Sequence, residues 1–226
     1  MNIVSRLFQS TLGKKYIMAV TGFLLFGFVL VHLLGNLQLF SGAEAINRYA
    51  ELLRAEPALL WAARVGLLVI VILHIVTAIQ LVLRNRAARP QKYAGGKDPV
   101  GASVTSRTAA ISGTVILAFI IFHLLHYTLG VINPDYLSYH DAQGRHDVFR
   151  MVVHGFSNPF IAGFYLVSMA LLCAHLSHGL GAMFQSLGFR NGAYDKVIDR
   201  LAKLGAAVIF LGNCAIVLSV LLGVVK

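Results

Sequence analysis

The stretch IMAVTGFLLFGFVLVHLLGNLQLF, residues 17–40, decides the fold, because its 24 residues include no charged side chain and only one histidine. A helix of about 20 apolar residues crosses the hydrocarbon core of a bilayer, which is about 30 Å thick. Four more long apolar stretches follow, at residues 61–83, 108–131, 159–184 and 204–225. We therefore predict an all-α integral membrane protein, in which residues 1–226 form a single bundle of five transmembrane helices. The longest connections should contribute only short surface helices, such as one over residues 43–53.

The composition of the whole chain agrees with a membrane protein. Of 226 residues, 58% are hydrophobic and 12% are charged, whereas about 25% are charged in an average soluble domain. The net charge of +10 would suggest a nucleic-acid partner for a soluble protein. Here the basic residues lie between the apolar stretches and form no single patch, so we expect membrane lipid around the chain and no nucleic acid.

Basic residues gather in alternate connections. Arg6, Lys14 and Lys15 precede the first span, residues 84–107 contain six basic residues, and residues 190–203 contain four. Connections rich in lysine and arginine stay in the cytoplasm. The first apolar run is too long for the core of a cleaved signal peptide, so it remains a span. We expect a multi-pass protein of a bacterial cytoplasmic membrane, with a cytoplasmic N-terminus and Lys226 outside.

Motifs for several cofactors are missing from the sequence. It contains no GxGxxG motif, no P-loop and no CxxC pair, and its two cysteines, Cys173 and Cys214, lie far apart in apolar runs. A dinucleotide or an iron–sulfur cluster therefore has no recognisable site in this chain. Such chemistry would have to come from a partner.

A faint internal repeat relates the first and third spans. The pair TG at residues 21–22 is followed by HLL at residues 32–34, and the pair SG at residues 112–113 is followed by HLL at residues 123–125. The histidine stands ten residues after the glycine in both copies. We interpret the two spans as copies of one unit, with the second and fourth spans as the matching second halves.

Four of the five spans carry a histidine in their interior. The helical rise puts His32 and His123 about 22 and 24 Å into their spans, at one level. His74 and His175 lie about 20 and 24 Å into spans of the opposite direction, at a second level about 12 to 16 Å away. Two imidazoles at one depth can take both axial positions of a haem iron, which then transfers electrons and binds no oxygen. We predict an outer haem at His32 and His123 and an inner haem at His74 and His175.

Other interpretations of the histidines stay open. A lone histidine in a span is equally compatible with a neutral imidazole that is hydrogen-bonded to a neighbouring helix. His126 and His178 each follow a predicted ligand by three residues, but they lie about 28 Å along their helices, where we expect a solvated or propionate-bonding side chain at the membrane surface. The remaining histidines are expected on the surface: His140, His146 and His154.

Short motifs along most of the chain resemble a known family. They are KKYIMAVTGF, HLLGN, GAEAIN, LHI, SRTAAISG, FHLLH, SNPF, GFYLVSMA and HLSHG, beginning at residues 14, 32, 42, 73, 106, 122, 157, 163 and 175. With these motifs the chain resembles the cytochrome b membrane anchor of succinate:quinone oxidoreductases, in its single-subunit, five-helix, dihaem form.

This resemblance implies a role and partners. The family's axial ligands of two haem b groups fall on His32, His74, His123 and His175, paired first with third and second with fourth. The implied partners are a flavoprotein subunit, which oxidises succinate or reduces fumarate, and an iron–sulfur subunit, both on the cytoplasmic face. The chain would carry electrons between the iron–sulfur subunit and a quinone, which we expect to be menaquinone, while the dicarboxylate chemistry stays on the partners.

The quinone site is less defined. The family places quinone chemistry near the outer haem, where Glu56 is a candidate proton donor or acceptor; its alternative is a solvated residue before Pro57. Arg64 and Arg107 are candidate partners of haem propionates or quinone, and the alternative for each is a side chain that reaches the lipid headgroups. The fourth span contains no acid, so we expect no proton route of the kind attributed to that span in some dihaem fumarate reductases.

Two further functions remain as alternatives. The first is the cytochrome b subunit of another quinone-linked enzyme, such as a hydrogenase or a formate dehydrogenase. The second is a cofactor-free transporter or proton channel that uses the histidines as a relay. The spans have neither interior acids nor helix-interrupting prolines, which disfavours the transporter.

Overall fold

Five helices long and apolar enough to cross a membrane form the body of the protein in a computed structural model, which describes residues 7–88 and 107–226. They are α2 (Thr11–Asn36), α4 (Pro57–Ala87), α6 (Ala109–His123), α8 (Pro159–Ser186) and α9 (Asp195–Leu221). The π-helical turn η2 (Leu124–Thr128) continues α6. These described ranges contain no β-strand. The prediction of an all-α protein with five potential spans is therefore confirmed, and these five helices indicate a multi-pass membrane protein.

The helices extend beyond most of the predicted apolar stretches. The largest difference is at the last span, which begins at Asp195 and not near residue 204, because the polar segment before the apolar run continues the same helix. This helix ends at Leu221, just before Gly223, whose φ of 69° is a left-handed conformation that terminates helices.

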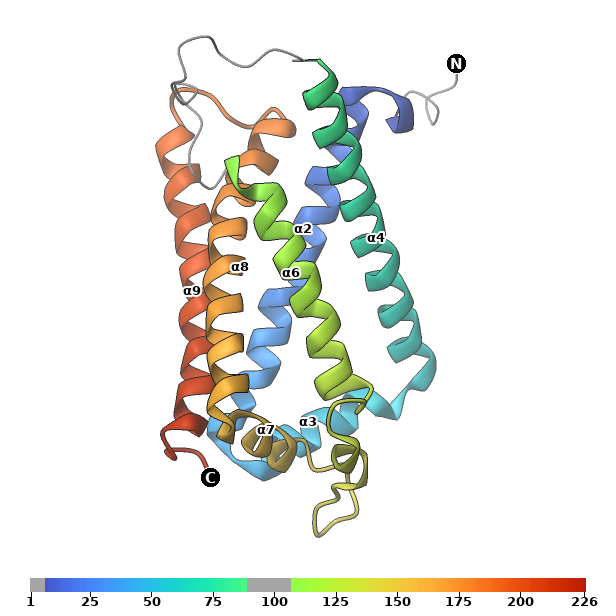
Figure 1. Ribbon diagram of the computed structural model, residues 1–226, viewed down its shortest axis with the longest axis vertical. Coiled ribbons are helices and arrows are strands. Elements are labelled where there is room, and N and C mark those ends of the chain that lie inside the picture. Colours follow the sequence, from blue (N-terminus) through green and yellow to red (C-terminus); the bar gives the residue numbers. More distant parts are fainter. Residues whose placement is uncertain (1–6, 89–106) are drawn as a thin grey trace.

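Helix α2 runs through the bundle and contacts α4, α8 and α9, while α6 packs on α8 and α8 lies along α9 (Figure 1). Close approach of α9 to α2 depends on Gly212. A Cβ atom at this position would lie 2.8 Å from Leu33 Cδ2, so any side chain there would have to displace the buried Leu33. Small residues allow such close packing between membrane helices. Helix α4 is attached mainly along α2, and Thr77 is its one buried residue.

Three short helices lie across the end of the bundle where α9 ends, opposite the start of α2 (Figure 1). They are α3 (Ala43–Ala55), η3 (Pro134–Ser138) and α7 (Val148–Ser157), and we call them the capping layer. The 3₁₀ helix η1 (Leu37–Ser41) leads from α2 into this layer. A short surface helix over residues 43–53 was expected and is confirmed, whereas α7 was not anticipated.

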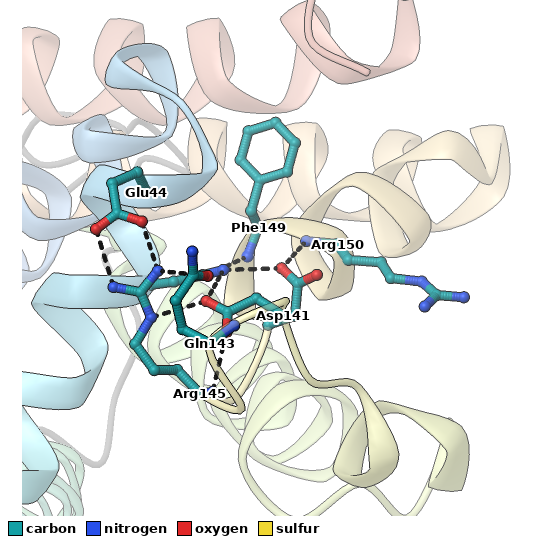
Figure 2. Close-up of polar contacts among 8 residues, drawn as sticks. Glu44, Asp141, Gln143, Arg145, Phe149 and Arg150 are labelled. Carbon is teal, nitrogen blue, oxygen red and sulfur yellow. Dashed lines mark hydrogen bonds and ion pairs between the residues drawn. The ribbon is translucent and has the colours of Figure 1, made fainter.

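An arginine at the centre of a polar network holds the capping layer together (Figure 2). The Arg145 guanidinium donates hydrogen bonds to both Glu44 oxygens, at 3.0 and 2.6 Å, and its Nε donates to Asp141 at 2.8 Å. The hydrogen bond from Arg145 lowers the pKa of Glu44. Burial alone would raise the pKa of Asp141, but hydrogen bonds from Arg145 lower it overall. The network therefore ties α3 to the segment before α7.

Asn47 completes this network from a buried position in α3, with 1% of its surface exposed. Its amide nitrogen donates to Asp141 at 3.3 Å and to Asp147 at 3.1 Å, and its oxygen accepts from the Phe149 backbone N–H at 3.0 Å. Asp147 also caps α7 by accepting from the Arg150 N–H at 3.0 Å. One buried amide thus fixes the start of α7 against α3.

Candidate functional site

The first candidate histidine, His74 of α4, is held against α2 by the hydroxyl of Thr21. The distance from His74 Nδ1 to Thr21 Oγ1 is 3.0 Å, and the same hydroxyl donates to the Ile17 carbonyl at 2.7 Å. A hydroxyl has one hydrogen, so Thr21 accepts from a protonated Nδ1. The Nε2 atom of His74 therefore keeps its lone pair, and no described residue makes a hydrogen bond to it. This is the tautomer that binds a metal through Nε2.

The arrangement repeats at His175 of α8, which contacts Ser112 of α6. His175 Nδ1 lies 3.3 Å from Ser112 Oγ, and this hydroxyl donates to the Ala109 carbonyl at 3.1 Å. By the same count of hydrogens, Nδ1 of His175 is protonated and Nε2 has its lone pair.

A glycine faces each of these two imidazole rings. A Cβ atom on Gly22 would lie 3.4 Å from His74 Cε1, and one on Gly113 would lie 3.6 Å from His175 Cε1. The pairs TG and SG of the internal repeat are thus the residues that contact the histidines of the second and fourth spans. The units α2–α4 and α6–α8 present an imidazole in the same way.

The second level brings His32 of α2 and His123 of α6 together, with ring centres 5.8 Å apart and ring planes at 88°. His32 stacks on Phe28 with ring centres 5.5 Å apart, and within residues 7–88 and 107–226 its ring makes no hydrogen bond. His123 Nδ1 lies 3.1 Å from the hydroxyl of Tyr165, which belongs to α8. The surroundings of this pair are aromatic, unlike those of His74 and His175.

His126 corrects one expectation, because it is fully buried and does not lie in water at the membrane surface. Its Nδ1 is 3.2 Å from the Tyr165 hydroxyl and its Nε2 is 3.5 Å from the Tyr136 hydroxyl. The helical rise gave the wrong environment because the π-helical turn η2 changes the register after His123, and the capping layer covers this end through Tyr136. Both ring nitrogens have protein partners, so His126 is a satisfied structural side chain.

Hydrogen bonding separates His126 from the four predicted ligands. Each of the four keeps at least one ring nitrogen without a described protein partner inside an apolar span. An unsatisfied polar group costs free energy in a membrane, so these nitrogens favour a ligand. His178 is half-buried and also makes no hydrogen bond in the described ranges, but the contacts with Ser112 and Gly113 belong to His175.

The other histidines lie in or beside the capping layer. His140 and His154 are exposed as expected, and His154 Nδ1 is 2.7 Å from the Tyr139 hydroxyl. His146 is half-buried, and burial is the largest cause that lowers its pKa.

Glu56, Arg64 and Arg107 do not form one site. Glu56 is exposed at the N-cap of α4, and its side chain makes no capping hydrogen bond. Arg64 is exposed, with its guanidinium carbon 5.1 Å from the centre of the Trp61 ring. Arg107 is exposed just before α6, at the other end of the bundle. Glu56 and Arg64 are near the capping layer, so only these two lie at the level expected for the quinone.

Four contact residues were missed by sequence reasoning: Thr21, Ser112, Tyr136 and Tyr165. The first two had a signal, since they stand in the repeated TG and SG pairs. Tyr165 and Tyr136 had none, because their roles depend on α8 and η3 lying beside η2.

The separation of His32 and His123 fits a metal held by two imidazoles. With metal–nitrogen bonds of about 2 Å, two rings on opposite sides of one metal have centres about 6 Å apart, close to the 5.8 Å between His32 and His123. Over the described ranges, no group of three or more His, Cys, Asp or Glu residues could hold a metal ion. A haem needs only the two axial side chains, because its porphyrin supplies the other ligands.

Comparisons with protein-family models, with curated proteins and with solved structures find no match. The function is therefore inferred from the histidines and their surroundings, together with the sequence motifs.

Proposed function

We propose that the protein is a dihaem cytochrome b that anchors a succinate dehydrogenase or fumarate reductase and connects it to the membrane quinone pool. One observation carries the proposal: four apolar helices each carry a histidine with a ring nitrogen that the described residues leave unpaired, and the rings of His32 and His123 lie 5.8 Å apart. A ligand for such a site must be apolar enough for a membrane interior and must accept two imidazoles. Haem b meets both requirements.

In this proposal His74 and His175 bind the inner haem, and Thr21 and Ser112 keep them ready to do so. Partners that hold the second nitrogen of a metal-binding histidine fix its tautomer and ring orientation. Gly22 and Gly113 leave space beside the rings. The repetition of this arrangement in two helix pairs argues against a chance hydrogen bond of a core histidine.

His32 and His123 bind the outer haem in the same proposal. Tyr165 orients His123 through Nδ1, and His32 relies on stacking with Phe28. When bound, the two haems supply a one-electron path across the membrane between partner and quinone. With two histidines holding each iron, the haems would transfer electrons and would not bind oxygen.

The proposed orientation follows from charge. Lys14, Lys15, Arg84 and Arg86 lie at the end of the bundle where α2 begins and α4 ends, and the positive-inside rule places this end in the cytoplasm of a bacterium. The flavoprotein and iron–sulfur subunits would dock there. Menaquinone would react near the outer haem at the opposite face, where Glu56 is the candidate proton donor or acceptor.

Purification of the protein from membranes in a mild detergent tests the function. We expect a reduced-minus-oxidised spectrum with b-type haem bands, and we expect a flavoprotein and an iron–sulfur subunit to copurify. Copurification with hydrogenase or formate dehydrogenase subunits would leave the haem assignment unchanged, but it would assign the chain to another quinone-linked enzyme. A spectrum without haem bands would overturn the proposal and favour the transporter.

A further inference from the structure

A buried lysine lies between α2 and α4, on the side of His74 that faces the start of α2. Lys14 is 7% exposed, and its ammonium group donates a hydrogen bond to Gln80 Oε1 on α4. One turn further toward the helix end, Arg84 donates to Thr11 Oγ1 at 3.3 Å. Among the residues that the structure describes, no carboxylate lies within ion-pair distance of Lys14. A buried cation is thus paired only with a neutral amide.

This burial is unusual for a lysine near the end of a membrane helix. Such a side chain normally extends its ammonium group to the headgroups and water. The next residue, Lys15, is exposed as this rule expects, whereas Lys14 is turned into the contact between two helices. A buried charge without a counter-ion costs free energy, and an amide dipole offsets only part of that cost. The position of Lys14 therefore favours an anion nearby.

The location of Lys14 indicates which anion. Lys14 precedes Thr21 by seven residues, so the two side chains share one face of α2 about 10.5 Å apart along the axis. On α4, Gln80 follows His74 by six residues. The contacts Thr21–His74 and Lys14–Gln80 therefore follow one another along the same helix pair. An anion at Lys14 would lie between the inner histidines and the end of the bundle.

We propose that Lys14, positioned by Gln80, is the counter-ion of a propionate carboxylate of the haem bound at His74 and His175. This inference rests on the proposed function, because it assigns a partner to the cofactor of the same site. Lys14 thereby has an electrostatic role in setting the redox potential of the inner haem. A positive charge close to a haem favours the reduced state, which carries one positive charge less, and so raises the midpoint potential.

The test compares Lys14→Gln with Lys15→Gln in the purified complex. Both variants remove one positive charge from adjacent positions, but only Lys14 is buried. Haem content and equilibrium redox titrations are measured, and the inner haem is the component that His74→Ala removes. We expect Lys14→Gln to keep two haems and to lower the midpoint potential of the inner haem alone. Lys15→Gln should match the wild type, and Lys14→Arg should keep the wild-type potential.

Two results would overturn the role of Lys14 while leaving the proposed function intact. One is a Lys14→Gln protein with two haems and unchanged potentials, and the other is an equal shift in Lys15→Gln. If Lys14→Gln loses the inner haem, Lys14→Arg decides: recovery of the haem supports a charge role, and continued loss shows a packing role. A wild-type protein without haem would remove both proposals together.

Discussion

The two levels of histidines present the same side chain in different surroundings. At the inner level, His74 and His175 each contact a hydroxyl and a glycine from the neighbouring helix. At the outer level, His123 shares the Tyr165 hydroxyl with His126, while His32 has only ring contacts. The inner level is built from the internal repeat, and the outer level depends on aromatic residues contributed by the helices around it.

The two levels therefore depend on different parts of the structure. The inner contacts lie within two helix pairs and need no loop. The outer cluster includes Tyr136, which the capping layer brings onto His126, and that layer is held by Asn47 and Arg145. Changes in the capping layer should therefore reach the outer level first.

Replacing the proposed ligands should have the largest effect. His74→Ala or His175→Ala should remove the inner haem and keep the outer one, and His32→Ala or His123→Ala should do the reverse, because each iron loses an axial ligand. Haem content per polypeptide and redox titration measure this.

The controls for this prediction are the neighbouring histidines. His126→Ala and His178→Ala should keep two haems. Loss of haem from either control, while His123 and His175 variants remain normal, would overturn the assignment of ligands.

The hydroxyl contacts of the inner level should have the next largest effect. Thr21→Ala or Ser112→Ala should weaken binding of the inner haem by about 10- to 100-fold, as loss of a histidine's supporting partner does in other metal sites. Thr21→Ser and Ser112→Thr keep the hydroxyl and should behave like the wild type. Transfer of haem to an acceptor protein measures the loss. Equal weakening of both haems would contradict the comparison.

Replacing Asn47 should have a smaller effect, mainly on the outer level. Asn47→Ala removes three hydrogen bonds in the capping layer and should destabilise it by about 1 to 2 kcal/mol, since buried partners are left unpaired. On heating, the outer haem should be released before the inner one. Glu51→Gln changes an exposed residue of the same helix and is the control. It should leave the release of both haems on heating unchanged.

Acid should produce the smallest effect, confined to low pH. Arg145 lowers the pKa of Glu44 and Asp141 in the folded protein, so their contribution to stability is complete above their ordinary pKa of about 4 and is lost as the pH falls below it. Hydrogen exchange should show α3 and residues 139–147 loosening in that range, and Arg145→Gln should remove this dependence. Faster hydrogen exchange around His74 and His175 in the same pH range would contradict this prediction.

Much of the fold follows from sequence because apolar length is a strong physical signal. The five spans and α3 were expected, and the TG and SG pairs marked the helix positions that contact His74 and His175. The environment of His126 was predicted wrongly, since neither the π-helical turn nor the covering Tyr136 has a local signal. Lys14 was seen only as one of several basic residues, because burial depends on how α4 lies beside α2.

A density map of the purified protein tests the central claim most directly. The account predicts flat porphyrin density between His32 and His123 and again between His74 and His175, with each iron about 2 Å from two imidazole nitrogens. A map in which these four rings contact only lipid and neighbouring side chains would contradict it.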